Sequence, residues 1–231
     1  EDHQMSLSNC QNCKIYYSDP YTHSDYILGQ DSLLSIWAKQ WGLEYNGETP
    51  QIYLTQAEID YFKPFYKTEK PILAIQPNGG PDSLGYNYSW TRDIPKPIVE
   101  KVIEEFKSTH TVVHIKRKDQ QTYPDTLHAL DGFRSIAILL QLSDKRLFID
   151  SFSQHLAAAY NLSSTVCWVT TKPEVFGYKL HTNIKANKFD LKVDFPSNLY
   201  QGFNLAQDVT SCPYSKLENV FDVDKIIKSL K

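Results

Sequence analysis

The chain lacks an excess of charge of either sign and any long apolar run. Its 231 residues include 24 Lys and Arg against 27 Asp and Glu, a formal net charge of −3. This balance does not favour nucleic acid as a partner. No apolar run approaches the roughly 18 residues of a membrane-spanning helix, and the opening EDHQMSLSNC lacks the layout of a signal peptide. We therefore expect a cytoplasmic protein, or one whose leading segment precedes residue 1.

Cysteine is scarce, and its pattern is incomplete for a metal site. The chain has 4 cysteines, of which Cys10 and Cys13 form a C-x-x-C pair. No second pair and no H-x-x-x-H follows, so a zinc site is not favoured. Cys167 lies in the apolar run TVCWV and is expected in the core. We expect neither a metal nor a disulfide framework.

Several motifs that define enzyme classes are also missing. Neither G-x-x-x-x-G-K-[ST] nor G-x-G-x-x-G occurs, which argues against a P-loop NTPase and a dinucleotide oxidoreductase. G-x-S-x-G is absent too. Ser151 and His155 stand four residues apart at an expected helix start, a spacing that rarely gives the geometry of a catalytic triad. A serine hydrolase is therefore not favoured.

What is present divides the chain into two parts. The first part is polar and predicts a helix over 32–41, where apolar residues recur at helical spacing before Gly42. A short strand is expected over 52–54. Thr55 and Glu58 then form a capping-box pattern for the next helix. We predict residues 1–65 as a mostly helical extension, or the remnant and connector of a preceding half.

From Pro71 onward, strands and helices alternate. Buried strands are expected over 72–77, 111–116, 146–150 and 164–169. The helices between them are expected over 98–106, 134–144 and 153–161, with a closing amphipathic helix over 223–230. Continuous apolar strands joined through helices indicate an α/β fold, a Rossmann-like parallel sheet with helices on both faces. We predict this domain over residues 66–231.

Ligands of such a sheet bind beyond the carboxyl ends of its strands. The helix expected near Ser153 would offer unpaired backbone N–H groups to an anion, with Ser151, Ser153 and His155 nearby. The alternative is an ordinary N-cap beside a semi-buried histidine. Lys116 to Lys118 follow another strand, and they could neutralise phosphate charge or form a solvated basic turn.

These residues resemble a known family. FIDSFSQHLAAAYNLSSTVCWV is similar to the D-[ST]-G-x-x-H-x-A-A-A segment of the heptosyltransferase-like glycosyltransferases of family nine, which have the GT-B architecture. ILAIQPNGG resembles the opening strand of that family's C-terminal half, and SWTRDIP resembles its K-R-W-P segment. The likeness covers about residues 71–185 and implies the nucleotide-sugar-binding half of a GT-B fold.

The resemblance also implies a donor site without a metal or other cofactor. Asp150 would face the sugar, and Ser151 with the following backbone N–H groups of Phe152 and Ser153 would hold the diphosphate. His155 would support that loop. The other side of the cleft would be lined by Asn78 and Arg92, with Lys116 as a further candidate.

Two departures from the family pattern bear on this site. Phe152 stands where the family has glycine, so a backbone with positive φ at this position would be strained. The loop path or donor pose would then differ, or donor binding would be lost. Second, the order W-T-R inverts the family's basic residue and Trp, so Arg92 need not replace that basic side chain one for one.

Only about 70 residues precede the expected donor-binding domain, and they lack strand–helix alternation. We therefore interpret the chain as the donor-binding half of a glycosyltransferase, with the half that would supply the acceptor site and general base not included. Asp19, His23 and Asp25 have side chains that can act as general bases, but nothing in the sequence places them in the cleft. No catalytic residue is assigned.

The function expected is therefore bacterial glycosyl transfer from a nucleotide-sugar, such as an ADP-heptose-like donor, to a cell-surface glycan or lipopolysaccharide acceptor. Partners would be that donor and a glycan or glycolipid, with no nucleic acid. Because such acceptors are attached to the membrane, the protein would associate peripherally with its inner face. The alternatives are a non-catalytic nucleotide-sugar-binding or interaction module and, with no specific motif behind it, a nucleotide-sugar epimerase.

Overall fold

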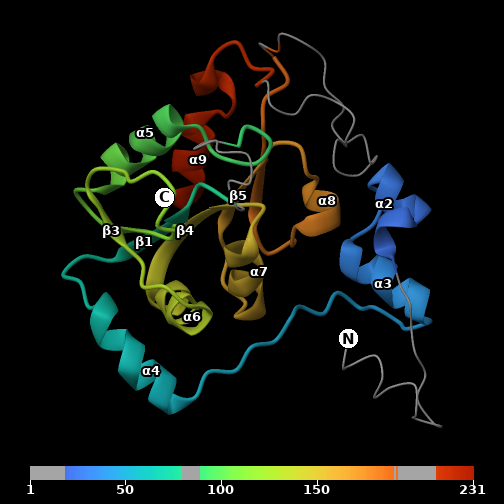
Figure 1. Ribbon diagram of the computed structural model, residues 1–231, viewed down its shortest axis with the longest axis horizontal. Helices are drawn as coiled ribbons and strands as arrows, with labels where there is room; N and C mark the ends of the chain where they lie inside the picture. The colour runs from blue at the N-terminus through green and yellow to red at the C-terminus, as the bar shows by residue number, and fades with distance from the viewer. Residues whose placement is uncertain (1–18, 80–88, 190, 192–211) are drawn as a thin grey trace.

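The computed structural model describes residues 19–79, 89–189, 191 and 212–231. The Cys10–Cys13 pair lies outside these residues. Figure 1 shows a central sheet with helices on both sides and the N-terminal helices α2 and α3 beside α8. Within the described residues, no helix combines the length and the apolar character needed to cross a membrane.

All strands of the central sheet run parallel, in the order β3-β2-β1-β4-β5-β6. The strands are β1 (Ile72–Gln76), β2 (Thr111–His114), β3 (Thr126–His128), β4 (Ser143–Ile149), β5 (Thr165–Trp168) and β6 (Thr182–Lys185). The chain moves outward from β1 to β3 and then returns to the other side of β1 with β4. This order has its switch point between β1 and β4, as in a Rossmann-type sheet. The predicted fold class is confirmed.

The two faces of the sheet are covered by different helices (Figure 1). On one face lie α5 (Lys96–Phe106) and α9 (Val223–Leu230). The other face is covered by α6 (Phe133–Leu142) and α7 (Phe152–Ala159). Within β1, Leu73 and Ile75 pack in the first cluster, whereas Ile72 and Ala74 pack in the second. This alternation explains why the strand is a continuous apolar run: both of its faces are buried.

The N-terminal residues form η1 (Pro20–Thr22), α2 (Ser24–Leu28), α3 (Leu33–Trp41), α4 (Gln56–Phe62) and η2 (Lys63–Tyr66). Tyr26 and Ile36 form a small cluster with Val175 of α8 (Pro173–Phe176). Tyr66 anchors the second junction, because its hydroxyl lies 2.6 Å from Ser135 Oγ and accepts a hydrogen bond from Leu130 N. The N-terminal part is thus joined to the sheet domain at two separate places.

One expected element is wrong. Residues 52–54 run as extended chain without forming a strand. Ile52 and Leu54 are partly buried against the second core cluster, while Tyr53 is 78% exposed. Alternating burial therefore arises here from packing of an extended segment on helices, and the pattern alone does not distinguish that from a sheet strand.

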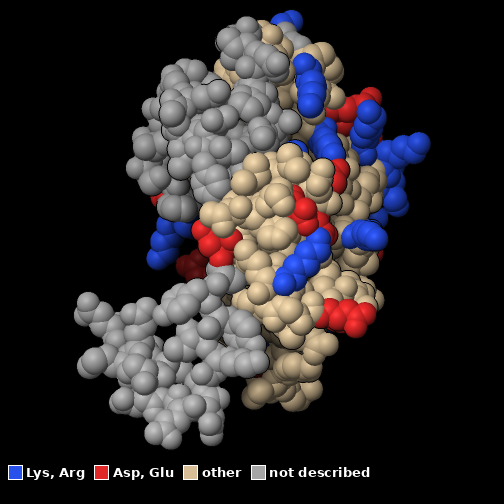
Figure 2. Space-filling view, turned by 90° about the vertical axis from the view of Figure 1, so that its right-hand side faces the viewer, with Lys and Arg blue, Asp and Glu red and all other residues tan. Residues whose placement is uncertain are grey.

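The face that carries α2 and α3 is partly apolar. Figure 2 shows it with acidic and basic side chains beside a broad uncharged area. Between η1 and the segment just after α3, the exposed large apolar side chains are Tyr21, Ile27, Leu28, Trp41 and Leu43. Trp37 and Trp41 stack with a ring separation of 6.5 Å.

Candidate functional site

A cavity of about 230 Å³ lies at the carboxyl ends of β1, β2, β3 and β4. This is the position at which Rossmann-type sheets bind their ligands. The residues around it come from five separate segments of the chain: Gln76, Asn78, Gly79, Ile115, Lys116, Arg117, Gln120, Ala129, Leu130, Asp131, Gly132, Ile136, Ser151 and Phe152. Of the eight residues predicted from the sequence, Asn78, Lys116, Ser151 and Phe152 line the cavity.

Two helices begin at this cavity without a capping side chain. The N-cap of α7 is Ser151, and the N-cap of α6 is Gly132; neither helix has a side-chain hydrogen bond to its first turn. The first backbone N–H groups of a helix have no partner within the helix. With the positive end of the helix dipole, they attract anions. Two such ends at one cavity make it suited to a negatively charged ligand.

In the basic loop after β2, Lys116 lines the cavity and forms no ion pair within the described residues. The ammonium of Lys116 donates hydrogen bonds to the carbonyls of Arg117 and Gln120, at 3.0 and 2.9 Å. Arg117 instead pairs with the carboxylate of Asp119 through Nε and Nη2, at 2.9 and 2.8 Å. Lys116 is therefore the stronger source of positive potential at the cavity wall.

A buried carboxylate, not predicted from the sequence, organises the loop after β1. Asp93 is 3% exposed and accepts hydrogen bonds from Asn78 Nδ2, Gly79 N and Ser89 N, each at 3.0 Å. Burial raises the pKa of Asp93, although these hydrogen bonds oppose the shift. The amide nitrogen of Asn78 is thus turned toward Asp93, and its side chain serves the loop as well as the cavity.

Arg92 and Asp150 lie next to each other, beside the residues that line the cavity. Arg92 Nη1 donates to the backbone carbonyl of Asp150 at 3.3 Å. Burial raises the pKa of the Asp150 carboxyl group, opposed by the nearby Thr171 side chain and by the positive charge of Arg92. The segment after β5 holds the backbone next to Arg92 in place, because Thr170 donates through both N and Oγ1 to the carbonyl of Thr91.

Ser153 and His155 do not line the cavity. Ser153 is fully buried, and its hydroxyl has no hydrogen-bond partner. His155 Nδ1 lies 3.0 Å from the Tyr178 hydroxyl, and its Nε2 accepts from Gln154 at 3.0 Å. Gln154 also donates to the carbonyl of Phe176. Burial lowers the pKa of His155, so the imidazole is neutral near pH 7 and connects α7 to the segment after α8.

Phe152 shows none of the backbone strain that a positive φ would impose. It is the first residue of α7, after Ser151 in extended conformation at φ −155° and ψ 172°. Among the described non-glycine residues, only Asp125 and Asn161 have positive φ. The Phe152 side chain is 38% exposed and forms part of the cavity wall. A large side chain is accommodated here because the loop enters the helix through an extended residue.

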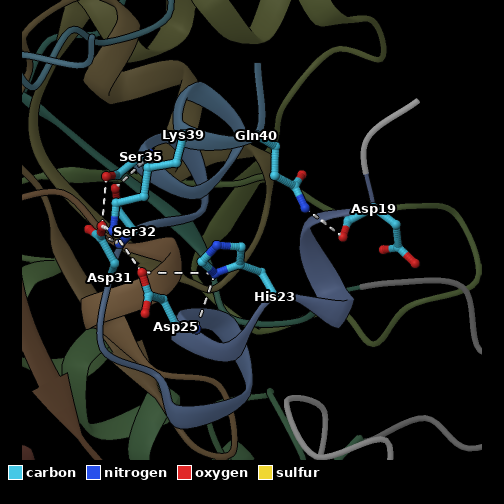
Figure 3. Close-up of polar contacts among 8 residues, drawn as sticks. All are labelled: Asp19, His23, Asp25, Asp31, Ser32, Ser35, Lys39 and Gln40. Atoms are coloured by element: carbon cyan, nitrogen blue, oxygen red, sulfur yellow. Dashed lines mark hydrogen bonds and ion pairs between the residues drawn. The ribbon is translucent and has the colours of Figure 1, made fainter. Parts of the chain in front are cut away.

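The three acidic or basic residues singled out near the N-terminus belong to a separate polar cluster (Figure 3). Lys39 of α3 bridges Asp25 and Asp31 at 2.6 and 2.8 Å. His23 Nδ1 accepts from the backbone N–H of Asp25 and caps α2, and the side chain of Asp19 caps η1. None of them lines the cavity. The described residues contain no group of three His, Cys, Asp or Glu arranged to hold a metal.

Sequence reasoning also missed Gln76, the last residue of β1. Its side chain is 7% exposed and lines the cavity. The available signal was a single polar residue at the end of the apolar strand ILAIQ.

Comparison with known proteins identifies the fold but gives no relative in sequence. No family model matches the chain, and no curated protein matches it. The structure is similar to that of a family 9 glycosyltransferase from Veillonella parvula, with a TM-score of 0.59, 12% identity and coverage of 87% of this chain and 59% of that one. The structure of E. coli ADP-heptose LPS heptosyltransferase II is also similar, with a TM-score of 0.50 and 14% identity. That match covers 71% of this chain and 55% of the heptosyltransferase.

A third similar structure is the dodecameric iron-containing heptosyltransferase TibC, in complex with ADP-D-beta-D-heptose, with a TM-score of 0.54, 10% identity and coverage of 88% of this chain and 54% of that one. These likenesses confirm the resemblance at the level of the fold. The chain spans between half and three fifths of the length of the glycosyltransferases it matches.

Proposed function

We propose that the chain binds a nucleotide-sugar and is the donor-binding half of a glycosyltransferase. The observation that carries this proposal is the meeting of two uncapped helix N-termini with Lys116 at the carboxyl edge of the sheet. A diphosphate needs dense, fixed hydrogen-bond donors and positive charge, and backbone N–H groups at helix starts supply both. The fold shared with solved glycosyltransferases is consistent with that use.

The size of the cavity suggests how the donor divides between enclosed and open parts. At about 230 Å³, it is smaller than the roughly 300–1,000 Å³ of sites that enclose a whole small ligand. The nucleotide would occupy the cavity, with its diphosphate at the start of α7. The sugar would then lie outside, toward Asp150, where the resemblance also puts it, and near Arg92.

The reaction would be a direct displacement at the anomeric carbon. The acceptor hydroxyl oxygen forms a bond to that carbon while the bond to the diphosphate oxygen breaks, and a general base takes the hydroxyl proton. The α7 amides and Lys116 would stabilise the negative charge that develops on the leaving diphosphate. The general base is expected from a second half that faces this one, because the chain spans only part of the enzymes it resembles.

The donor and acceptor follow from the similar structures as proposals. One is described as an ADP-heptose LPS heptosyltransferase, and another was solved with ADP-D-beta-D-heptose. We therefore propose an ADP-sugar of the heptose type as donor and a lipopolysaccharide-like glycan as acceptor, with no metal required. The alternative, a non-catalytic donor-binding module, is distinguished from the enzyme by a transfer assay.

Calorimetric titration of ADP-sugars and UDP-sugars tests the proposal. Lys116→Met should weaken binding of the preferred donor by roughly 10- to 150-fold, since a charged hydrogen-bond donor to phosphate contributes roughly 1.5–3 kcal/mol. Lys118→Met provides the matched control, because Lys118 is exposed in the same loop and does not line the cavity. Failure of the parent chain to bind any nucleotide-sugar, or equal binding by both variants, would contradict the donor site.

Transfer assays separate the enzyme from the module. Incubation of the chain with the preferred donor and a deacylated lipopolysaccharide acceptor should give a glycosylated product and free nucleoside diphosphate only when a polypeptide that carries the second half is added. Donor binding without transfer in either condition would favour the non-catalytic module.

A further inference from the structure

Gln76 carries a buried amide for which the described protein supplies no hydrogen bond. The side chain is 7% exposed, and its Oε1 is buried without a partner. An unsatisfied buried amide is unfavourable, and such groups in folded proteins call for an explanation. This one lies at the end of β1, in the lining of the cavity. A ligand in the cavity would be in reach to satisfy it.

The walls around Gln76 define the kind of group that would enter. Ile72 and Ala74 of β1 face the cluster that includes α6, so Gln76, two residues further, faces the same side. Ile115 and Ile136 belong to that cluster and also line the cavity, together with Ala129 and Leu130. A space with aliphatic walls and a single primary amide suits a flat heteroaromatic ring with a polar edge.

We propose that Gln76 is a specificity-determining residue that binds the polar edge of the donor's nucleobase. A glutamine amide offers one donor and one acceptor side by side, and it can pair with the 6-amino group and a ring nitrogen of adenine. This inference rests on the proposed nucleotide-sugar function. It assigns Gln76 to the base, separately from the helix starts and Lys116, which hold the diphosphate.

The test combines a protein change with a ligand change. ADP, 2′-deoxy-ADP and purine riboside diphosphate, which lacks the 6-amino group, are titrated against the parent and against Gln76→Met. The parent should bind ADP roughly 5- to 150-fold more tightly than purine riboside diphosphate, the range for a bidentate amide–base pair. Gln76→Met should bind these two equally. Gln141→Leu, at an exposed position of α6, should retain the parent's preference.

Thermal unfolding without ligand distinguishes a binding role of Gln76 from a structural one, because the two roles predict different Tm values for Gln76→Met. Removing an unsatisfied buried amide should leave Tm unchanged or raise it. A clear fall in Tm of Gln76→Met would make the amide a structural group and overturn the proposal.

Three binding outcomes are also decisive. No discrimination by the parent between ADP and purine riboside diphosphate overturns the proposal even if Gln76→Met does not fold. If Gln76→Met instead loses a preference of the parent for ADP over 2′-deoxy-ADP, Gln76 is assigned to the ribose, and the proposal is also overturned. If no nucleotide binds the parent, the proposed function itself fails, an outcome distinct from normal ADP binding that Gln76→Met leaves unchanged.

Discussion

The helices of the N-terminal part and the helices that begin at the cavity differ in how their first turns are capped. The side chains of His23, Ser32 and Thr55 cap α2, α3 and α4, and Thr55 forms a complete capping box with Glu58. At the cavity, α6 and α7 have no side-chain cap. The residue types do not explain this alone, since Ser151 is a favoured N-cap residue that makes no capping hydrogen bond here.

Buried polar groups follow this contrast only at the cavity. Gln76 of β1 lines the cavity and has a buried Oε1 without a hydrogen-bond partner. Buried polar atoms without partners also occur away from it, at His114 of β2, Ser153 of α7 and Gln40 of α3. Unsatisfied donors and acceptors reduce stability, and of these four groups only Gln76 can be completed by a ligand in the cavity.

The largest predicted change in the free energy of unfolding comes from His114, and it appears when the pH is lowered. Burial lowers the pKa of His114 to about 3, so the folded protein keeps the ring neutral while the unfolded chain protonates it below about pH 6.5. Its contribution to stability is present above pH 6.5 and is lost as the pH falls toward 3. Between pH 6.5 and 4.5 the loss should be roughly 2 kcal/mol, measured by urea unfolding at each pH.

The variant His114→Phe isolates this contribution. Its unfolding free energy should fall less over the same pH range, because no imidazole titrates at that site. Shifts at other groups, including the raised pKa values of Asp93 and Asp150, act in both proteins and cancel in the difference. His128→Asn, at the exposed position paired with His114 on β3, removes one of the charges that lower the pKa of His114 and should therefore reduce the pH dependence only slightly. Parallel pH curves for the parent and His114→Phe would refute the assignment.

A carboxylate placed at the start of α7 should convert the open helix end into a capped one. In Ser151→Asp the new side chain can accept from the first-turn N–H groups and complement the helix dipole, stabilising the ligand-free protein by about 0.5–1 kcal/mol. It would occupy the position proposed for the diphosphate, so ADP-sugar binding should weaken by about tenfold or more. Calorimetry measures the second effect and thermal unfolding the first.

Ser108→Asp supplies the matched charge for this experiment. Ser108 is exposed just before β2, at the opposite end of the strands from the cavity. It adds the same charge without reaching the α7 start, so it should bind donor as the parent does. Equal loss of affinity in both variants would indicate a general charge effect and would remove the evidence for anion binding at α7.

The fold was predictable where burial alone determines the residue types. Strand β1 lies between two cores, and α5 has one apolar face, so both were expected from periodicity. The edge strands β3 and β6 were missed because they are short and largely exposed; Leu127 in β3 is 55% exposed. Their positions depend on the register with β2 and β5 rather than on a local apolar pattern.

The site was predictable only in part, for a related reason. Parallel strands end at one edge, so loop residues such as Lys116 and Ser151 could be expected at the same cavity. The direction of each side chain could not be expected. His155 follows Ser151 by about one helical turn but bonds to Tyr178, and Asp93 reaches Asn78 through a loop closure that has no sequence signature.

The smallest predicted effect compares the two kinds of helix start directly. Thr55→Ala removes both the side-chain acceptor of Glu58 N and one partner of the Glu58 carboxylate, and should destabilise the protein by about 1 kcal/mol. Ser151→Ala removes no capping hydrogen bond and should stay within about 0.5 kcal/mol of the parent without ligand. Thr55→Ser retains the acceptor and should behave as the parent. Denaturant unfolding measures all three, and an equal loss in Thr55→Ala and Ser151→Ala would mean that α7 is capped in solution after all, leaving its N–H groups unavailable to a diphosphate.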